Sequence, residues 1–480
     1  MKTFLVVFAL SFLSVCAFSQ LPQDQIFRMN NPAVFTITAT EAGGATHVGS
    51  AFCLRQDGVL VTTYHTIANA SSAVVRSIYD KDIKVLGTLA VSPEHDLAII
   101  KVEDAGLSEV QLGQSEYTRA SELVTIVASE APSKNAFVKG KISADYKKEH
   151  IAEEYQQLIP VEGDFLPRYN GAPLLSGSGG RAMGVLLATD DPKDNYKVAL
   201  AVPIEEVRLL MKNMSATPQP LSPQGDYFKT KQGLYWAGRL DEVNNDFNDA
   251  LAHYKSAVQM DPQFYPALFQ IGYDAELRGD HTSAKDAFTR AKEFPETASL
   301  AAFNLGLIDL VLNDLPNAEQ NFQFAVEKDA KFLKAYDKLG ETYELEKQPD
   351  KALAAYMKAR DLKETDTYSE LRVAHILFDQ QKWRDAAKAA KKAREAGVDS
   401  VDVYLIEADS WFHVKDYLQA WDLANRGTQL RAGANMPRLW YIMAASDMKI
   451  KNEADRAKTE LDKLQTLDPA SAKELQGGAK

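Results

Sequence analysis

Residues 168–175 read Arg-Tyr-Asn-Gly-Ala-Pro-Leu-Leu, a short stretch with small residues at its centre followed by an apolar run. Two motifs precede this loop: Thr-Thr-Tyr-His-Thr-Ile at residues 62–67, and Glu-His-Asp-Leu-Ala-Ile-Ile-Lys-Val at residues 94–102. His65 of the first motif comes 31 residues before Asp96 of the second. Histidine, then aspartate, then a nucleophile carried on a tight loop is one of the orders in which the members of a catalytic triad follow one another along a sequence. These three stretches therefore decide the fold and the candidate site of the N-terminal half.

Short β-type segments separated by turn residues dominate residues 33–212. Residues 49–54 and 59–63 flank the turn at residues 55–58, whose Asp-Gly pair is a strong hairpin signal. Many short strands at close spacing, with few helices, predict a β-barrel architecture. The other predicted strands are residues 33–40, 72–79, 84–91, 97–102, 123–128, 136–142, 156–161, 172–175, 182–187 and 197–202.

The loop at residues 168–175 resembles the nucleophile loop of trypsin-type serine proteases, whose usual pattern is Gly-Asn-Ser-Gly-Gly-Pro-Leu-Leu. The region as a whole resembles the bacterial trypsin-like proteases of the high-temperature-requirement (Deg) type. Residues 49–52 (Gly-Ser-Ala-Phe) are similar to their strand before the histidine. Residues 201–204 (Ala-Val-Pro-Ile), with a predicted helix over residues 205–211, are similar to their closing strand and helix. The resemblance implies an all-β, chymotrypsin-like double β-barrel.

The resemblance also implies roles for the candidate site. His65 would take the proton of the nucleophile, and Asp96 would fix the histidine tautomer. Asn170 stands where the serine should be, and a carboxamide cannot form an acyl-enzyme; loss of the nucleophile alone costs roughly 10⁶ in kcat in subtilisin. The oxyanion hole would use the backbone N–H groups of Arg168 and Asn170, and the former position is normally a glycine. Two departures at neighbouring positions predict a domain that has lost its chemistry.

Ser178, in the run Ser-Gly-Ser-Gly-Gly at residues 176–180, is the alternative nucleophile. The residue after this run is Arg181 rather than a proline, and Gly184 follows too soon for the usual strand and turn. Small residues at this place are typical of a hairpin turn. We therefore favour a turn here, and Ser178 remains the residue on which an active serine endopeptidase would depend.

A linker and a helical array complete the chain. Residues 213–230 contain Pro218, Pro220 and Pro223, which predicts a short, semi-stiff connector. A 34-residue period then runs over residues 231–471, which matches seven tetratricopeptide repeats, and residues 472–480 form a C-terminal tail. Small residues at positions 8 and 20 of each repeat would let its two helices approach closely, in an all-α solenoid. Position 20 is Ala250, Ala284, Ala318, Ala352, Ala386 and Ala420 in successive repeats.

The first helix of each repeat is expected to line a concave groove that binds a protein or peptide. The fourth repeat instead places Asp337, Glu341 and Glu344 there, which favours a partner with a basic segment. Two other readings stay open: these side chains pack between adjacent repeats, or the groove holds the chain's own β-domain or linker. The predicted apolar groove residues are Tyr235, Phe269, Tyr273, Phe303, Leu307 and Leu310.

Composition excludes several classes of function. The net charge is −12 and the isoelectric point about 5.3, which argues against nucleic acid or an anionic membrane as a partner. No metal-type spacing links His47 and His95, and nothing indicates a cofactor. Cys53 lies within an apolar strand pattern, where a buried thiol is expected.

The N-terminus has the pattern of an export signal. Lys2 precedes an apolar run over residues 4–15, and Ala-Phe-Ser at residues 17–19 fits the small-x-small rule, with cleavage after Ser19. A lipoprotein site at Cys16 is the alternative, although Val15 is large for the preceding position. No later segment reaches the ~18 apolar residues of a membrane span. The predicted location is secreted or periplasmic.

These observations predict an exported trypsin-like pseudoprotease fused to a protein-binding scaffold that acts in interaction or assembly in the cell envelope. The alternative is an active serine endopeptidase whose repeats recruit protein substrates. A third reading is a holdase whose cleft binds unfolded peptides without cutting them.

Overall fold

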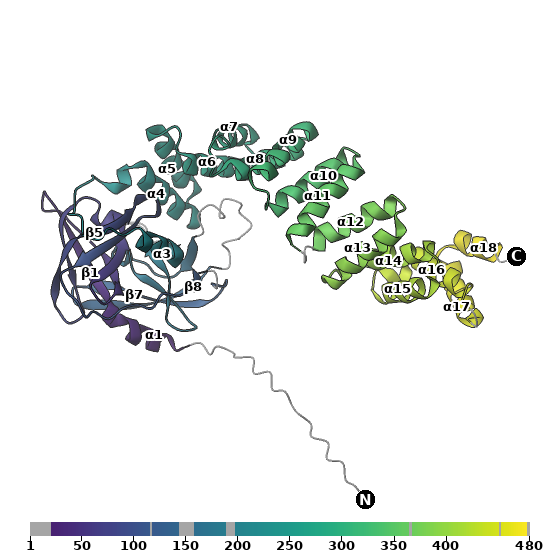
Figure 1. The fold of residues 1–480 in the computed structure, drawn as a ribbon, viewed down its shortest axis with the longest axis horizontal. Helices are drawn as coiled ribbons and strands as arrows, with labels where there is room; N and C mark the ends of the chain where they lie inside the picture. Colours follow the sequence, from purple (N-terminus) through teal and green to yellow (C-terminus); the bar gives the residue numbers. More distant parts are fainter. Residues whose placement is uncertain are drawn as a thin grey trace, which may run out of the picture. The chain divides into compact units, whose positions relative to one another are not determined.

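The computed structural model describes residues 21–115, 118–143, 158–188, 197–363, 367–450 and 453–477. It divides into two compact units, Met1–Arg278 and Gly279–Lys480 (Figure 1). The predicted export signal, with Cys16, and part of the predicted strand at residues 156–161 lie outside the described residues.

The first barrel is a closed antiparallel sheet of six strands, in the order β1-β2-β3-β6-β5-β4. Alternate side chains from its strands point inward, and Phe35, Ile37, Leu60 and Ile100 fill the interior. The turn predicted at residues 55–58 joins β2 to β3. The strands are β1 (Val34–Glu41), β2 (Thr46–Arg55), β3 (Val59–Thr63), β4 (Ala70–Arg76), β5 (Asp82–Ser92) and β6 (Leu97–Val102).

The second barrel is also closed and antiparallel, in the order β10-β11-β12-β9-β8-β7. Helix α1 (Gln23–Asn30) contacts β7, and α3 (Ile204–Lys212) follows β12, as the sequence predicts. The predicted double β-barrel is thus confirmed. The strands are β7 (Leu123–Ala131), β8 (Lys134–Ile142), β9 (Ile159–Glu162), β10 (Pro173–Ser176), β11 (Ala182–Leu187) and β12 (Val198–Pro203).

The segment predicted as a connector is bonded to the first barrel. Gln219 and Thr88 of β5 exchange two backbone hydrogen bonds of 2.8 Å each. Gly87 has φ +149°, and a Cβ at this position would collide with the carbonyl of Gln219, so glycine permits the close approach. Farther along, the N–H of Gln224 donates to the carbonyl of Ala68 at 2.8 Å. Residues 215–224 therefore follow the barrel surface and do not form a free connector.

The first unit continues through α4 (Lys231–Val243), α5 (Phe247–Met260) and α6 (Tyr265–Leu277). The expected close approach between the two helices of the first repeat is present. A Cβ at Gly238 of α4 would lie only 2.6 Å from the Tyr254 ring of α5. The first repeat therefore belongs to the same compact unit as the barrels.

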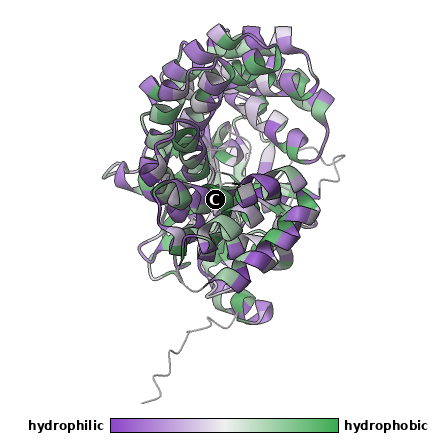
Figure 2. Cartoon of the chain, turned by 90° about the vertical axis from the view of Figure 1, so that its right-hand side faces the viewer, coloured by the Kyte–Doolittle hydropathy of each residue, from purple (hydrophilic) through white to green (hydrophobic). Residues whose placement is uncertain are grey.

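The second unit consists of helices. Gly306 faces the Phe322 ring and Gly340 faces the Tyr356 ring in the same way. A Cβ added at these glycines would lie 2.6 and 2.7 Å from the respective rings. Hydrophobic and hydrophilic residues alternate along these helices (Figure 2), as expected where one side of each helix is buried. Its helices are α7 (His281–Ala291), α8 (Ala298–Val311), α9 (Leu315–Lys328), α10 (Leu333–Leu345), α11 (Pro349–Leu362), α12 (Thr367–Asp379), α13 (Trp383–Glu395), α14 (Val401–His413), α15 (Tyr417–Gln429), α16 (Pro437–Asp447), α17 (Ala454–Leu467) and α18 (Pro469–Gly477).

The run of helices confirms the predicted all-α array. The described helices from α4 to α17 follow one another along the chain, joined by short turns, and α18 extends into the stretch predicted as a tail, where Ala472 is buried. Among the helices that the structure describes, none has both the length and the apolar character needed to cross a membrane.

Candidate functional site

Strand pairing in the first barrel brings His65 and Asp96 together. His65 lies on the short helix α2 (Tyr64–Ile67), directly after β3, and Asp96 directly precedes β6. The two strands are neighbours, with Thr63 opposite Leu97. Asp96 adopts a left-handed conformation with φ +50° after the 3-10 turn η2 (Pro93–His95). Aspartate tolerates this conformation better than most residues, since its short side chain can bond locally.

The carboxylate of Asp96 holds His65 at two points. Its Oδ2 lies 2.5 Å from His65 Nδ1, and its Oδ1 accepts the His65 backbone N–H at 2.7 Å. A carboxylate can only accept, so Nδ1 carries the proton and the tautomer is fixed. Both side chains are buried, 6% and 4% exposed. This is the geometry of a base and its orienting carboxylate.

The loop after η5 (Pro167–Tyr169) joins the second barrel to the first. The Ser50 N–H donates to the Asn170 carbonyl at 2.8 Å, and Ser50 Oγ donates to the Arg168 carbonyl at 3.0 Å. Gly171 has φ +86°, and a Cβ here would collide with the carbonyl of Ser50. Gly49 lies between this loop and Thr66, the neighbour of His65. A Cβ added at Gly49 would lie 3.2 Å from the Asn170 carbonyl oxygen and 3.0 Å from Thr66 Oγ1. The structure thus brings the Asn170 loop beside the histidine helix.

The polar groups of Asn170 point into the protein. The side chain is 1% exposed, and its Oδ1 accepts the Ala188 N–H at 2.5 Å. Its backbone N–H donates to the Pro167 carbonyl at 3.1 Å, within the 3-10 turn. An oxyanion hole needs this N–H to point at the substrate oxygen. Arg168, the other predicted oxyanion position, directs its guanidinium to the carbonyl of Glu130.

Ser178 lies in the turn between β10 and β11. The turn is closed by hydrogen bonds from Ser176 N to Arg181 O and from Gly180 N to Ser176 O, both 2.9 Å. Ser178 itself is exposed. The four residues of β10 separate it from the Asn170 loop, a span of about 13 Å at the rise of a strand. The structure therefore places Ser178 at the opposite end of β10 from the loop beside His65.

Two aromatic residues that the sequence reasoning missed cover His65. The Tyr227 ring lies 6.3 Å from the His65 ring at 30°, and the Phe228 ring lies 5.2 Å away at 47°. Both belong to the 3-10 turn η6 (Tyr227–Lys229), in the segment predicted as a linker. The sequence signal that could have indicated this contact is the Tyr-Phe pair at the end of an otherwise polar, proline-rich stretch.

Three of the predicted groove residues are buried. Tyr235 packs against Tyr254 and Phe264, while Phe303 packs against Phe322 and Phe332. Tyr235, Phe269 and Phe303 are 2–3% exposed, so they fill the space between helices and do not line an open face. This corrects the prediction for these three. Tyr273, Leu307 and Leu310 are half-buried.

The acidic side chains of the fourth repeat have contacts within the chain. Lys338 Nζ lies 2.7 Å from Glu341, and Arg372 contacts Glu344. Ser369 Oγ donates to Asp337 at 2.5 Å. Within the described ranges, no group of three or more His, Cys, Asp and Glu side chains could hold a metal ion.

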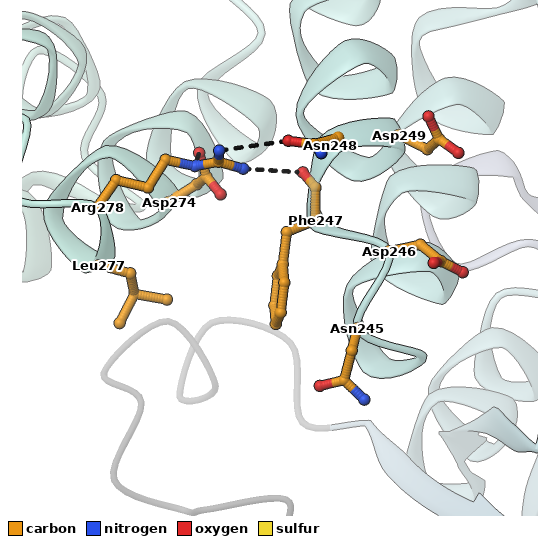
Figure 3. A pocket seen from close by; sticks show the side chains of 8 residues that line it. All are labelled: Asn245, Asp246, Phe247, Asn248, Asp249, Asp274, Leu277 and Arg278. Atoms are coloured by element: carbon orange, nitrogen blue, oxygen red, sulfur yellow. Dashed lines mark hydrogen bonds and ion pairs between the residues drawn. The ribbon is translucent and has the colours of Figure 1, made fainter.

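A hollow of about 600 Å³ lies between the start of α5 and the end of α6 (Figure 3). Arg278 bridges it by donating to Asn248 Oδ1 and to the Phe247 carbonyl, both at 3.3 Å, and it pairs with Asp274 at 2.8 Å. Its apolar lining consists of Phe247 and Leu277, which are exposed. His65, Asp96 and Asn170 do not line this hollow.

Burial makes Cys53 unreactive. Its side chain is fully buried on β2, as the sequence predicts, and Sγ donates to the Arg55 carbonyl at 3.0 Å. Burial raises the pKa of this thiol to about 11. The thiolate is the reactive form, so the thiol stays inert while the first barrel is closed.

Comparisons with known proteins agree with these domains. Residues 49–185 match the model of the trypsin-like peptidase domain, and residues 371–436 match the model of the tetratricopeptide repeat. The chain is 29% identical over 136 residues to the "Probable periplasmic serine endoprotease DegP-like" of Ectopseudomonas mendocina (strain ymp), which covers 28% of each protein. It is 24% identical over 186 residues to the mitochondrial serine protease HTRA2 of Drosophila grimshawi, covering 38% of this chain and 42% of the relative.

Among solved structures, the HtrA-type protease AlgW with a tripeptide matches with a TM-score of 0.36 and 21% identity, over 40% of this chain and 63% of that chain. Over the matched regions, the family models and the curated relatives show that the chain is similar to the trypsin-like peptidase domain of DegP- and HTRA2-type proteases and to tetratricopeptide repeats. It spans less than half the length of the curated relatives named here.

Proposed function

We propose that the chain is an exported pseudoprotease: its trypsin-like domain does not cleave peptide bonds, and its repeats bind protein partners in the cell envelope. One observation carries the first part. Asn170 commits its side-chain oxygen to Ala188 and its backbone N–H to Pro167. The position that the resemblance assigns to the nucleophile therefore supplies neither a nucleophile nor an oxyanion donor.

The His65–Asp96 pair alone does not argue for catalysis. A base accelerates a reaction only when a proton donor lies within about 3 Å of it in a substrate complex. Here the pair also has a structural role, because the carboxylate of Asp96 satisfies the backbone N–H at the start of α2. A buried pair with this role would be kept after catalysis is lost, since removing one partner leaves the other unsatisfied.

The binding part of the proposal rests on the repeats. Tetratricopeptide arrays present extended surfaces that suit protein partners. The periplasmic DegP-like relatives, together with the predicted signal at residues 1–19, support an exported protein and hence partners in the envelope.

A fluorophosphonate probe tests the loss of catalysis. The protein from Gln20 onward is treated with the probe beside trypsin as a reactive standard, and labelled peptides are mapped by mass spectrometry. We expect no labelled serine. A Ser178→Ala variant is the matched control: a label on Ser178 in the parent that this variant lacks would establish an active serine endopeptidase and overturn the proposal.

A further inference from the structure

We propose that the face of the first barrel that carries His65 and Asp96 is a docking surface, and that its occupant is the chain's own segment from Tyr227 to Trp236. The inference goes beyond the proposed function, because it concerns what covers the pair and holds whether or not the domain cleaves peptides. It also assigns a role to the end of the predicted linker and to the start of the first predicted repeat.

The contacts on the imidazole come first. Phe228 and Tyr227 place their rings 5.2 and 6.3 Å from the His65 ring, and Tyr227 also packs edge-on against Tyr64 at 5.6 Å. Aromatic pairs at these distances stabilise beyond the area that they bury. A peptide that binds against the His65 ring must therefore first displace the rings of Tyr227 and Phe228.

The same segment satisfies the turn that precedes Asp96. Tyr227 Oη donates to the Pro93 carbonyl at 2.7 Å, and Trp236 Nε1 donates to the Glu94 carbonyl at 3.1 Å. Both donors belong to buried side chains, 4% and 2% exposed. Burial, aided by the charge of Asp96, raises the pKa of Tyr227, so its hydroxyl remains a donor at ordinary pH. The turn that positions Asp96 is thus held by two residues from the segment.

The segment is anchored on both sides of these contacts. Upstream, Gln219 pairs with Thr88, as described above. Downstream, the Asn244 carboxamide accepts from the backbone N–H of Val198 at 3.1 Å and donates to its carbonyl at 2.8 Å, which imitates a strand partner at the start of β12. Anchors at both ends lower the entropy cost of seating the residues between them.

Docking also buries an apolar face of the first repeat. Trp236 and Leu240 of α4 belong to one buried cluster with Val202 of β12 and with Ile204 and Val207 of α3. The first helix of a solenoid otherwise leaves this face open, and arrays need terminal caps for that reason. The barrels therefore serve as the N-terminal cap of the array.

Acylation of histidines by diethyl pyrocarbonate measures the docking directly. The protein from Gln20 onward is acylated at neutral pH, and the rate at His65 is divided by the rate at His47, whose side chain is 47% exposed. We expect slow acylation of His65 in the parent. Phe228→Ala should raise the ratio at least about tenfold, because a buried group reacts through local opening and the loss of a packed ring makes opening easier.

Phe137→Ala is the matched control. Phe137 lies on β8 of the second barrel and contacts Phe27, so the same truncation there should leave the His65 ratio unchanged. Circular dichroism confirms that both variants fold. A His65 that reacts as fast as His47 in the parent, or a ratio that Phe228→Ala does not change, would overturn the inference. Neither outcome depends on the result with the fluorophosphonate probe.

Discussion

The two barrels contribute to the candidate site in different ways. In the first barrel, His65 and Asp96 keep a 2.5 Å contact and the orientation of a base and its carboxylate. In the second barrel, the loop around Asn170 turns its side-chain oxygen and its backbone N–H into the protein. The pair and the loop lie side by side, yet they direct their polar groups differently. The bonds of both segments support the fold: the Asp96 carboxylate holds the short helix that carries His65, and the loop satisfies the Asn170 N–H within its own 3-10 turn.

Asp96→Ala should have the largest effect on stability if the pair is retained for structure. The change removes two hydrogen bonds of a buried carboxylate and places alanine in a left-handed conformation, which together cost about 4 kcal/mol. Asp96→Asn should cost about half as much, since asparagine tolerates that conformation and keeps one acceptor oxygen. Alkylation of Cys53, which reacts only when the first barrel opens, reports the difference.

Asp82→Ala is the matched control for that prediction. Asp82 lies in the same barrel, but its ion pair with Arg76 is exposed, so its loss should cost under about 1 kcal/mol. If Asp96→Ala opened the barrel no more readily than Asp82→Ala, the pair would have no structural role, and its retention would point back to catalysis.

Asn170→Ala should have the next largest effect, in the second barrel. It removes the acceptor of the buried Ala188 N–H, and a buried donor left unsatisfied costs about 1–3 kcal/mol. Hydrogen exchange at residues 182–188 measures this loss, with the exposed Asn213→Ala as the control. Unchanged exchange in Asn170→Ala would show that the side chain does not hold the loop inward.

Tyr227→Phe should have a smaller effect. The ring stays in place while the bond to the Pro93 carbonyl is lost, at a cost of about 1 kcal/mol. Hydrogen exchange at residues 94–97 should accelerate, and the remainder of the first barrel should not change. Acceleration spread evenly over the barrel would mean that Tyr227 supports the whole fold and not the turn before Asp96 in particular.

Asn170→Ser should have the smallest effect on activity, namely none. A serine hydroxyl restores the missing atom, but the N–H of residue 170 still faces Pro167 and Phe228 still covers His65. Hydrolysis of a fluorescent casein substrate should stay at the level of the buffer, with trypsin as the positive control. Measurable hydrolysis by this variant would show that the loop and the cover rearrange readily, and that one residue separates the domain from a protease.

Local patterns predicted the elements well, and their contacts much less well. Alternation of apolar residues and the Asp-Gly turn indicated the strands, while the 34-residue period indicated the helix pairs, because each pattern reflects which side of an element is buried. The same reasoning placed Phe269 and Phe303 in an open groove, where the structure buries them. A period shows that a position recurs, but whether it faces solvent or the next helix depends on the rotation of that helix within the stack.

The sequence by itself determined the order His65, Asp96 and Asn170 along the chain and the 34-residue period of the C-terminal half. Only the tertiary structure decided that Asn170 bonds to Ala188, that Tyr227 and Phe228 cover His65, and that Trp236 reaches the turn before Asp96. These contacts join residues 18 to 163 positions apart. Hydrophobic burial is non-directional, so the sequence of an element shows which of its sides is buried but not against which residues. Those residues are fixed only when the barrels close and the chain returns across them.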